Sequence, residues 1–147
     1  MPVELLRPVT DDDLRGLAEW TWLEGITALR PWLVTACADV LLQDDDGGVW
    51  FLSTTLGTLE RHWDDVDALR AALGDQEQAD EFLSAWLVEG AARRGLEPGP
   101  GQALVLVPAP AVGGAYAVDN LAIYDTVVAL SLAGQLHRQL QHGPAAG

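Results

Sequence analysis

The sequence predicts an α+β fold, an antiparallel sheet (a meander plus C-terminal strands) packed by about four helices, including a long C-terminal helix. Two observations lead to this prediction. Helical and strand-like segments follow one another as a leading helix, a strand meander, two helices, further strands and a last helix. Hydrophobic residues make up 49% of the 147 residues and charged residues 20%, so the chain can bury enough apolar surface to offset the entropy lost on folding.

One domain is expected over residues 1–147, because this length suits a single core and no internal repeat is visible. Residues 1–20 would form an N-terminal helix or arm, and residues 20–142 the main body. Residues 143–147 are expected to be a frayed tail.

The N-terminal helix is predicted from its capping residues. Thr10 followed three residues later by Asp13 is a capping box. Leu14 and Leu17 would then lie on one side of the helix. Pro31 favours extended backbone in the residue before it, which predicts that a strand region begins there.

A meander of strands is predicted to end near Trp63. Residues 32–43 are rich in Val, Leu and small apolar residues and are predicted to form one strand. Residues 44–48, with the sequence Asp-Asp-Asp-Gly-Gly, have the composition of a hairpin turn, and residues 49–52 would be the next strand. The stretch from Thr54 to Leu59, which contains Gly57, is also β-prone, and a third strand is predicted to continue to about Trp63.

Two helices are predicted after the meander. Asp64 and Asp65 can cap the first of them, which Gly74 would end. The second would begin near Asp75 and run to a basic last turn that stops at Gly95. Its apolar stripe would consist of Ala79, Phe82, Leu83, Trp86 and Leu87.

The last part of the chain is predicted to hold two strands and the long helix. Residues 103–107 are a short apolar run typical of a buried strand, and residues 121–124 would form the final strand. Asp125 can cap the C-terminal helix. The apolar face of that helix would consist of Val128, Leu132, Leu136 and Leu140.

The charge of the chain excludes some partners. Its 22 acidic and 8 basic residues give a formal net charge of −14, which repels phosphate backbones and anionic lipids. Nucleic acid and membrane surfaces are therefore poor candidates. The same charge would speed encounter with a basic protein, although it would also serve solubility alone.

A cytoplasmic location is expected from cysteine usage and from the N-terminal residues. Cys37 is the only cysteine, so no disulfide can form within the chain. The first 23 residues contain five carboxylates and lack the apolar pattern of a signal peptide.

No metal, cofactor or catalytic site is predicted. The turn at residues 44–48 fails the calcium-loop spacing, because Leu42 and Ser53 would occupy two essential ligand positions. The histidines are scattered, and His137 is expected on the surface of the last helix. Cys37 is expected to be an inert residue within a strand. No nucleophile motif surrounds the serines, so an enzyme is not expected.

A protein-binding site is predicted where tryptophan meets acidic residues. Six tryptophans is a high count for 147 residues, and tryptophan is enriched at binding hot spots. Trp63 precedes three aspartates, and Trp50 follows the acidic turn. The predicted partner-binding residues are Asp44, Asp45, Asp46, Trp50, Trp63, Asp64, Asp65 and Asp67.

A set of short segments carries a resemblance to a known family. They are Val49-Trp50-Phe51-Leu52, Gly57-Thr58-Leu59-Glu60, Gly99-Pro100-Gly101-Gln102, Gly113-Gly114, Asp119-Asn120-Leu121 and Gly134-Gln135-Leu136-His137-Arg138-Gln139. In this order and spacing, the stretch from about Trp20 to His142 resembles the C-terminal domain of type VI secretion DNase-immunity proteins.

The resemblance implies a non-enzymatic, antitoxin-like protein that binds a secreted toxin, a nuclease, in the cytoplasm. A nuclease needs a basic DNA-binding surface, which an acidic inhibitor could cover. The alternative is a small ligand-binding or assembly module. Its mark would be an apolar pocket between sheet and helices, lined by tryptophan and by Tyr116 or Tyr124.

Overall fold

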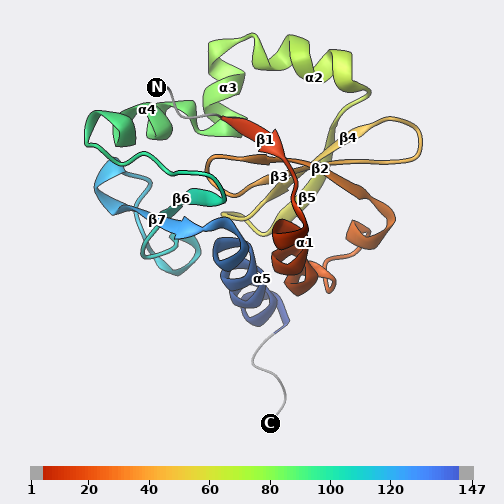
Figure 1. Cartoon of the computed structure of the whole chain (residues 1–147). Helices are drawn as coiled ribbons and strands as arrows, with labels where there is room; N and C mark the ends of the chain where they lie inside the picture. Colours follow the sequence, from red (N-terminus) through yellow and green to blue (C-terminus); the bar gives the residue numbers. More distant parts are fainter. Residues whose placement is uncertain (1–4, 143–147) are drawn as a thin grey trace.

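The computed structural model describes residues 5–142. Over these residues the chain forms an α+β fold with five α-helices and two antiparallel sheets (Figure 1). The fraying predicted for residues 143–147 lies outside the described residues. The strands are β1 (Leu6–Pro8), β2 (Arg30–Thr35), β3 (Val40–Gln43), β4 (Val49–Ser53), β5 (Thr58–Trp63), β6 (Gln102–Leu106) and β7 (Leu121–Asp125). The α-helices are α1 (Asp11–Leu17), α2 (Val66–Leu73), α3 (Gln76–Leu83), α4 (Ala85–Arg93) and α5 (Thr126–His142), and the 3-10 helices are η1 (Ala18–Trp20), η2 (Ile26–Ala28), η3 (Pro110–Val112) and η4 (Val118–Asn120).

The larger sheet is a meander in which β1 to β5 pair in chain order. The predicted turn at residues 44–48 joins β3 to β4. The single strand predicted for residues 32–43 is wrong, because a tight turn divides it into β2 and β3. In that turn the N–H of Thr35 donates to the carbonyl of Asp39 (2.8 Å), and Ala38 has a φ of 63°. Small apolar residues occupy both the strands and the turn, so composition does not mark the boundary.

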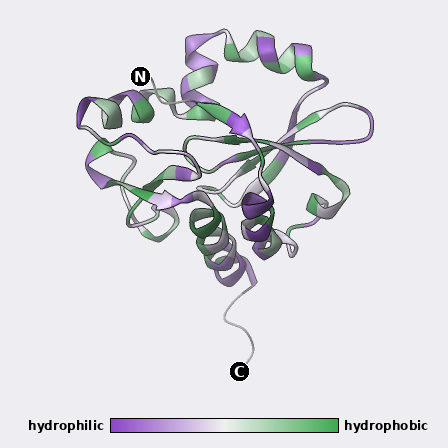
Figure 2. Ribbon diagram, viewed as in Figure 1, coloured by the Kyte–Doolittle hydropathy of each residue, from purple (hydrophilic) through white to green (hydrophobic). Residues whose placement is uncertain are grey.

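Helices cover both faces of the meander, with α2 and α3 on one side and α1 and α5 on the other (Figure 1). Side chains alternate between the faces along each strand. Leu41 and Phe51 pack with Leu69 of α2, whereas Leu42 and Leu52 pack with residues of α1 and α5. Figure 2 shows hydrophilic as well as hydrophobic residues along α2 and α5, as expected for helices with one solvent-facing side.

The two predicted C-terminal strands are confirmed as β6 and β7, but they form a separate two-stranded sheet. Helix α4 packs on this hairpin, where Leu87 and Val88 join one apolar cluster with Leu104. The N–H of Leu104 donates to the carbonyl of Ala36 (2.8 Å). This bond connects the small sheet to the turn between β2 and β3.

The predicted caps of the first two α-helices are confirmed. Thr10 and Asp13 form the capping box of α1, and Asp65 is the N-cap of α2. The single helix predicted after Asp75 is wrong, because Ser84 separates α3 from α4. Its φ of 52° is left-handed, a value that no helix interior accommodates. The apolar periodicity continues across Ser84, which is why the pattern alone does not reveal the break.

Helix α5 buries a different face from the one predicted. Three residues of the predicted stripe, Val128, Leu132 and Leu140, are between 42% and 52% exposed. The buried face instead contains Gly134, where an added Cβ would meet the carbonyl oxygen of Glu19 at 2.9 Å. The buried face of α5 thus combines the fully buried Leu130 with Gly134, where two backbones approach closely.

His137 lies on this buried face and is only 4% exposed. The surface position predicted for it is wrong. Its Nε2 lies 2.8 Å from the carbonyl oxygen of Thr54. A Cβ on Gly57 would meet the His137 ring. The imidazole therefore connects α5 to the loop between β4 and β5.

Candidate partner-binding surface

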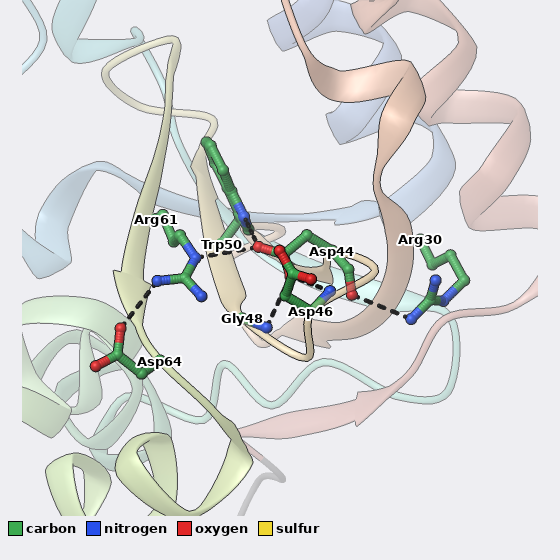
Figure 3. A network of polar contacts seen from close by, with 7 residues as sticks. All are labelled: Arg30, Asp44, Asp46, Gly48, Trp50, Arg61 and Asp64. Atoms are coloured by element: carbon green, nitrogen blue, oxygen red, sulfur yellow. Dashed lines mark hydrogen bonds and ion pairs between the residues drawn. The ribbon is translucent and has the colours of Figure 1, made fainter.

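Asp44 organises the acidic turn between β3 and β4. Its Oδ1 accepts hydrogen bonds from the N–H groups of Asp46 (2.9 Å) and Gly48 (2.8 Å). Its Oδ2 accepts from Trp50 Nε1 (2.8 Å) and Arg61 Nε (3.1 Å), as Figure 3 shows. The Trp50 indole, and then the other donors, hold the pKa of Asp44 well below its usual range. Asp44 therefore stabilises the turn as a permanent anion.

Arg61 joins the two halves of the predicted site. Besides Asp44, its guanidinium contacts Asp64, with 2.9 Å between Nη1 and Oδ1 (Figure 3). Both carboxylates raise the pKa of Arg61. The pairing of Val49 with Trp63 in the sheet places the turn next to the start of α2. Residues 44–46 and 64–67 thus lie at one end of the meander, and we call this region the acidic edge.

The acidic edge keeps a net negative charge even after its arginines are counted. It contains six aspartates (Asp44, Asp45, Asp46, Asp64, Asp65 and Asp67). Arg30 pairs with Asp45 (2.9 Å) and Arg61 with Asp44 and Asp64. Four negative charges remain uncompensated. Asp44 and Asp65 are engaged in the hydrogen bonds of the turn and of the helix cap. The other four aspartates are exposed, namely Asp45, Asp46, Asp64 and Asp67.

The two tryptophans of the predicted site differ in their exposure. Trp50 is half-buried and donates its indole N–H to Asp44. Trp63 is only 7% exposed and packs against Phe82, with 4.8 Å between ring centroids. Trp63 therefore offers a partner little surface, because α3 covers its ring. Among the six tryptophans Trp86 of α4 is the exposed one, at 43%. Its predicted place in the apolar stripe of one continuous helix is therefore wrong, since α4 begins anew after Ser84 and exposes Trp86.

A cleft of about 210 Å³ lies between α5, the small sheet and the loop after β4, and we call it the tyrosine cleft. Tyr116 and Tyr124 line it, as the ligand-binding alternative predicts, but no tryptophan does. Cys37 also lines the cleft, from the turn between β2 and β3. Burial, and then the charge of Asp39, raise the pKa of the Cys37 thiol to about 12. The thiol therefore stays protonated and unreactive at neutral pH.

The described residues contain neither a cluster of metal ligands nor a membrane-spanning helix. Within residues 5–142 no three His, Cys, Asp or Glu side chains gather as metal ligands would. His62 pairs with Glu60 (3.3 Å) and lies among aromatic rings. In the same part of the chain, no helix combines the length and the hydropathy needed to cross a bilayer.

Comparisons with known proteins add a family and a fold. The sequence matches the family described as T6SS immunity protein Tdi1, C-terminal, over residues 64–137. This segment includes the aspartates at the start of α2 but not the turn at residues 44–48. The structure resembles the crystal structure of Atu4351 from Agrobacterium tumefaciens with a TM-score of 0.60 and 14% identity, over 90% of this chain and 67% of that one. At this identity the likeness shows a shared fold. No curated protein matches the sequence.

Proposed function

The chain belongs to the family of the T6SS immunity protein Tdi1 C-terminal domain, and from this premise we propose that it binds and neutralises a cognate type VI secretion toxin. The proposed toxin is a nuclease with a basic DNA-binding surface, and the proposed contact is the acidic edge. Binding takes place in the cytoplasm and requires no covalent chemistry from this protein.

The observation that supports this proposal most is the joining of two acidic segments by Arg61. An inhibitor that covers a DNA-binding surface must present several carboxylates at once, because the basic residues it meets are spaced to bind phosphates. Arg61 holds the turn at residues 44–48 against the start of α2, so the exposed aspartates of both segments share one edge. A preorganised anionic edge loses little side-chain entropy on binding.

The charge of the whole chain supports the same mechanism. A net charge of −14 attracts a basic protein over a distance of about 10 Å, the Debye length at 0.1 M salt. The attraction raises the association rate, and the bound inhibitor then excludes DNA by occupying its site. Trp50, half-buried beside the exposed aspartates, offers an aromatic contact at the same edge.

The test uses the toxin encoded beside this gene and a nuclease assay. The acidic-edge variant replaces the four exposed carboxylates, of which Asp45 and Asp64 also pair with arginines, by amides that keep an accepting oxygen. It leaves Asp44 and Asp65, which hold the turn and the helix cap. It carries Asp45→Asn, Asp46→Asn, Asp64→Asn and Asp67→Asn. We expect its association rate at low salt to fall about tenfold and its salt dependence to flatten, because the steering charge is removed.

A matched control removes four exposed carboxylates from other elements. It carries Asp11→Asn, Glu24→Gln, Glu89→Gln and Glu97→Gln. This control should retain most of the association rate, since its charges lie away from the acidic edge. Equal losses in both variants would mean that total charge, and not this edge, directs binding. A toxin that stays active with the unmodified protein in excess would refute the proposed function.

A second candidate function is supported by the tyrosine cleft. Its walls are mainly apolar, and Tyr116 and Tyr124, which each carry a hydroxyl group, are among the lining residues. Pockets of this kind hold small apolar ligands with one or two polar groups. If the toxin stays active in the nuclease assay, a ligand-binding or assembly module becomes the favoured function.

A further inference from the structure

A second cleft, of about 430 Å³, adjoins the tyrosine cleft and shares Thr55, Ser84 and Tyr116 with it. We call it the Asp39 cleft. The most buried carboxylate of this cleft belongs to Asp39, which lies in the turn between β2 and β3. Residues of β5, α3 and α4 form the rim. This site lies outside the acidic edge and shares none of its residues.

The carboxylate of Asp39 is incompletely satisfied. Asp39 is only 7% exposed. Its Oδ1 accepts two hydrogen bonds from Thr54, one from the N–H and one from Oγ1, both at 2.8 Å. Its Oδ2 has no hydrogen bond or ion pair with a residue between 5 and 142 and is not among the buried atoms that lack a partner, so it is accessible from the cleft. A largely buried carboxylate with one accessible oxygen is stabilised by a cation that reaches it.

The other buried aspartate of the described chain, Asp13, is neutralised by an arginine. Asp13 is also buried, and Arg7 contacts both of its oxygens, at 2.6 and 3.0 Å. None of the eight arginines, all of which lie in the described part of the chain, lines the Asp39 cleft. Burial raises the pKa of Asp39 to about 6. At pH 7.5 the group is therefore mainly an anion without an internal counter-ion.

The rim of the cleft extends this negative site outward. Glu60, Asp80 and Glu81 bring three more carboxylates, and the exposed rings of Trp86 and Tyr116 stand beside them. Guanidinium groups form paired hydrogen bonds with carboxylates and stack on aromatic rings. Aromatic faces also attract cations directly. The cleft thus combines the groups that recognise an arginine side chain.

We propose that the Asp39 cleft binds an arginine side chain that a protein partner presents. Charge complementarity selects the cation, and the exposed Leu56, Trp86 and Tyr116 offer an apolar border that a partner's backbone would cover. That the arginine side chain comes from a protein partner rests on the proposed function. That the cleft binds a guanidinium group does not rest on it, so this part can be tested without the toxin.

The experiment titrates the ¹⁵N-labelled protein at pH 7.5 with the peptide acetyl-Gly-Arg-Gly-amide. Two reporter signals are the N–H of Thr54, which contacts Asp39, and the indole N–H of Trp86. We expect both to shift saturably. The same peptide with citrulline, which has the shape of arginine without its charge, should bind at least about tenfold more weakly.

Variants locate the site. Asp39→Asn keeps the oxygen that Thr54 bonds and removes the charge, so it should weaken arginine-peptide binding at least about tenfold while thermal unfolding shows an intact fold. Trp86→Ala, at an exposed position, should weaken binding about threefold. Glu97→Gln removes an exposed carboxylate from elsewhere and should change nothing.

Three results would overturn the proposal. The first is equal affinity for the arginine and citrulline peptides. The second is unchanged binding of the arginine peptide by both single variants, Asp39→Asn and Trp86→Ala, when each is folded. The third is free L-arginine binding as tightly as the peptide, which would assign the cleft to a small molecule. Because the toxin is absent, each result can occur whether or not the acidic edge binds it.

Discussion

Asp39 and Asp44 lie at opposite ends of strand β3, yet their carboxylates ionise in opposite ways. Asp44 accepts hydrogen bonds from an indole, a guanidinium and two backbone N–H groups, which favour its anion. Burial disfavours the anion of Asp39, and the two hydrogen bonds from Thr54 offset this effect only in part. Their different surroundings, and not their residue type, make Asp44 a structural element and Asp39 a candidate binding group.

The raised pKa of Asp39 predicts that it destabilises the fold at neutral pH. The folded-state pKa of about 6 exceeds the unfolded value of roughly 3.9. Between these values the folded state holds a proton that the unfolded state has released. The contribution of Asp39 to the free energy of unfolding therefore rises as pH falls through 6, by about 1.4 kcal/mol per pH unit.

The measurement is urea unfolding of the unmodified protein and Asp39→Asn between pH 4.5 and 7.5. Asp39→Asn should be the more stable protein at pH 7.5, and the difference should shrink towards pH 4.5. Comparing the two proteins cancels the titration of the groups around the cleft, namely Cys37, Glu60, His62, Asp80 and Glu81. A difference that does not vary with pH would contradict the raised pKa.

At the scale of elements, the contact between α1 and α5 determines which face of α5 is buried. Gly16 of α1 lies against α5, where an added Cβ would come within 2.8 Å of both Leu130 Cβ and the Val127 carbonyl oxygen. Gly134 of α5 lies equally close to Glu19. Small residues let the two backbones approach, so the helices meet at Gly16 and Gly134 beside the buried Leu17 and Leu130.

Gly16→Ala separates this packing effect from helix propensity. Propensity alone predicts stabilisation by up to about 1 kcal/mol. The close contact with α5 predicts the opposite, destabilisation by roughly 1–3 kcal/mol, because the backbone of α5 must move. Thermal or urea unfolding decides the sign. Gly74→Ala is the control, since its nearest neighbour would be 3.4 Å away and its φ is −72°, and it should be neutral or stabilising.

At the scale of the whole molecule, the net charge of −14 acts on the protein itself as well as on a partner. Like charges repel one another more strongly in the compact state than in the unfolded chain. The ion pairs between exposed side chains, such as Arg30 with Asp45, offset this repulsion only slightly. Self-repulsion should therefore dominate the response of stability to salt.

We expect the unfolding temperature to rise by about 3 °C between 20 and 500 mM NaCl, as salt screens this repulsion. The acidic-edge variant should rise less, because four of its negative charges are gone. Differential scanning calorimetry of both proteins provides the measurement. A fall in the unfolding temperature with added salt would show that attractive pairs, and not repulsion, govern the charge balance.

The fold class and several local features could be predicted from the sequence because short-range chemistry encodes them. Thr10 and Asp13 cap a helix with their own backbone, and the glycines at 47 and 48 complete a turn with Asp44. The acidic edge was partly predictable for the same reason, since its aspartates are adjacent in sequence. Its organisation by Arg61 was not, because Arg61 reaches Asp44 across the sheet.

By itself, the sequence determined the α+β class, most element positions and the excess of negative charge, all of which depend on residues close together in the chain. The tertiary structure decided that Trp63 and His137 are buried, that α5 buries Leu130 but exposes Val128, Leu132 and Leu140, and that no arginine lines the cleft at Asp39. Each of these depends on which distant backbone comes close, as Glu19 does to Gly134. The order of residues along the chain does not give the distance between remote segments. Burial, ion pairing and clefts are therefore settled only when the elements pack.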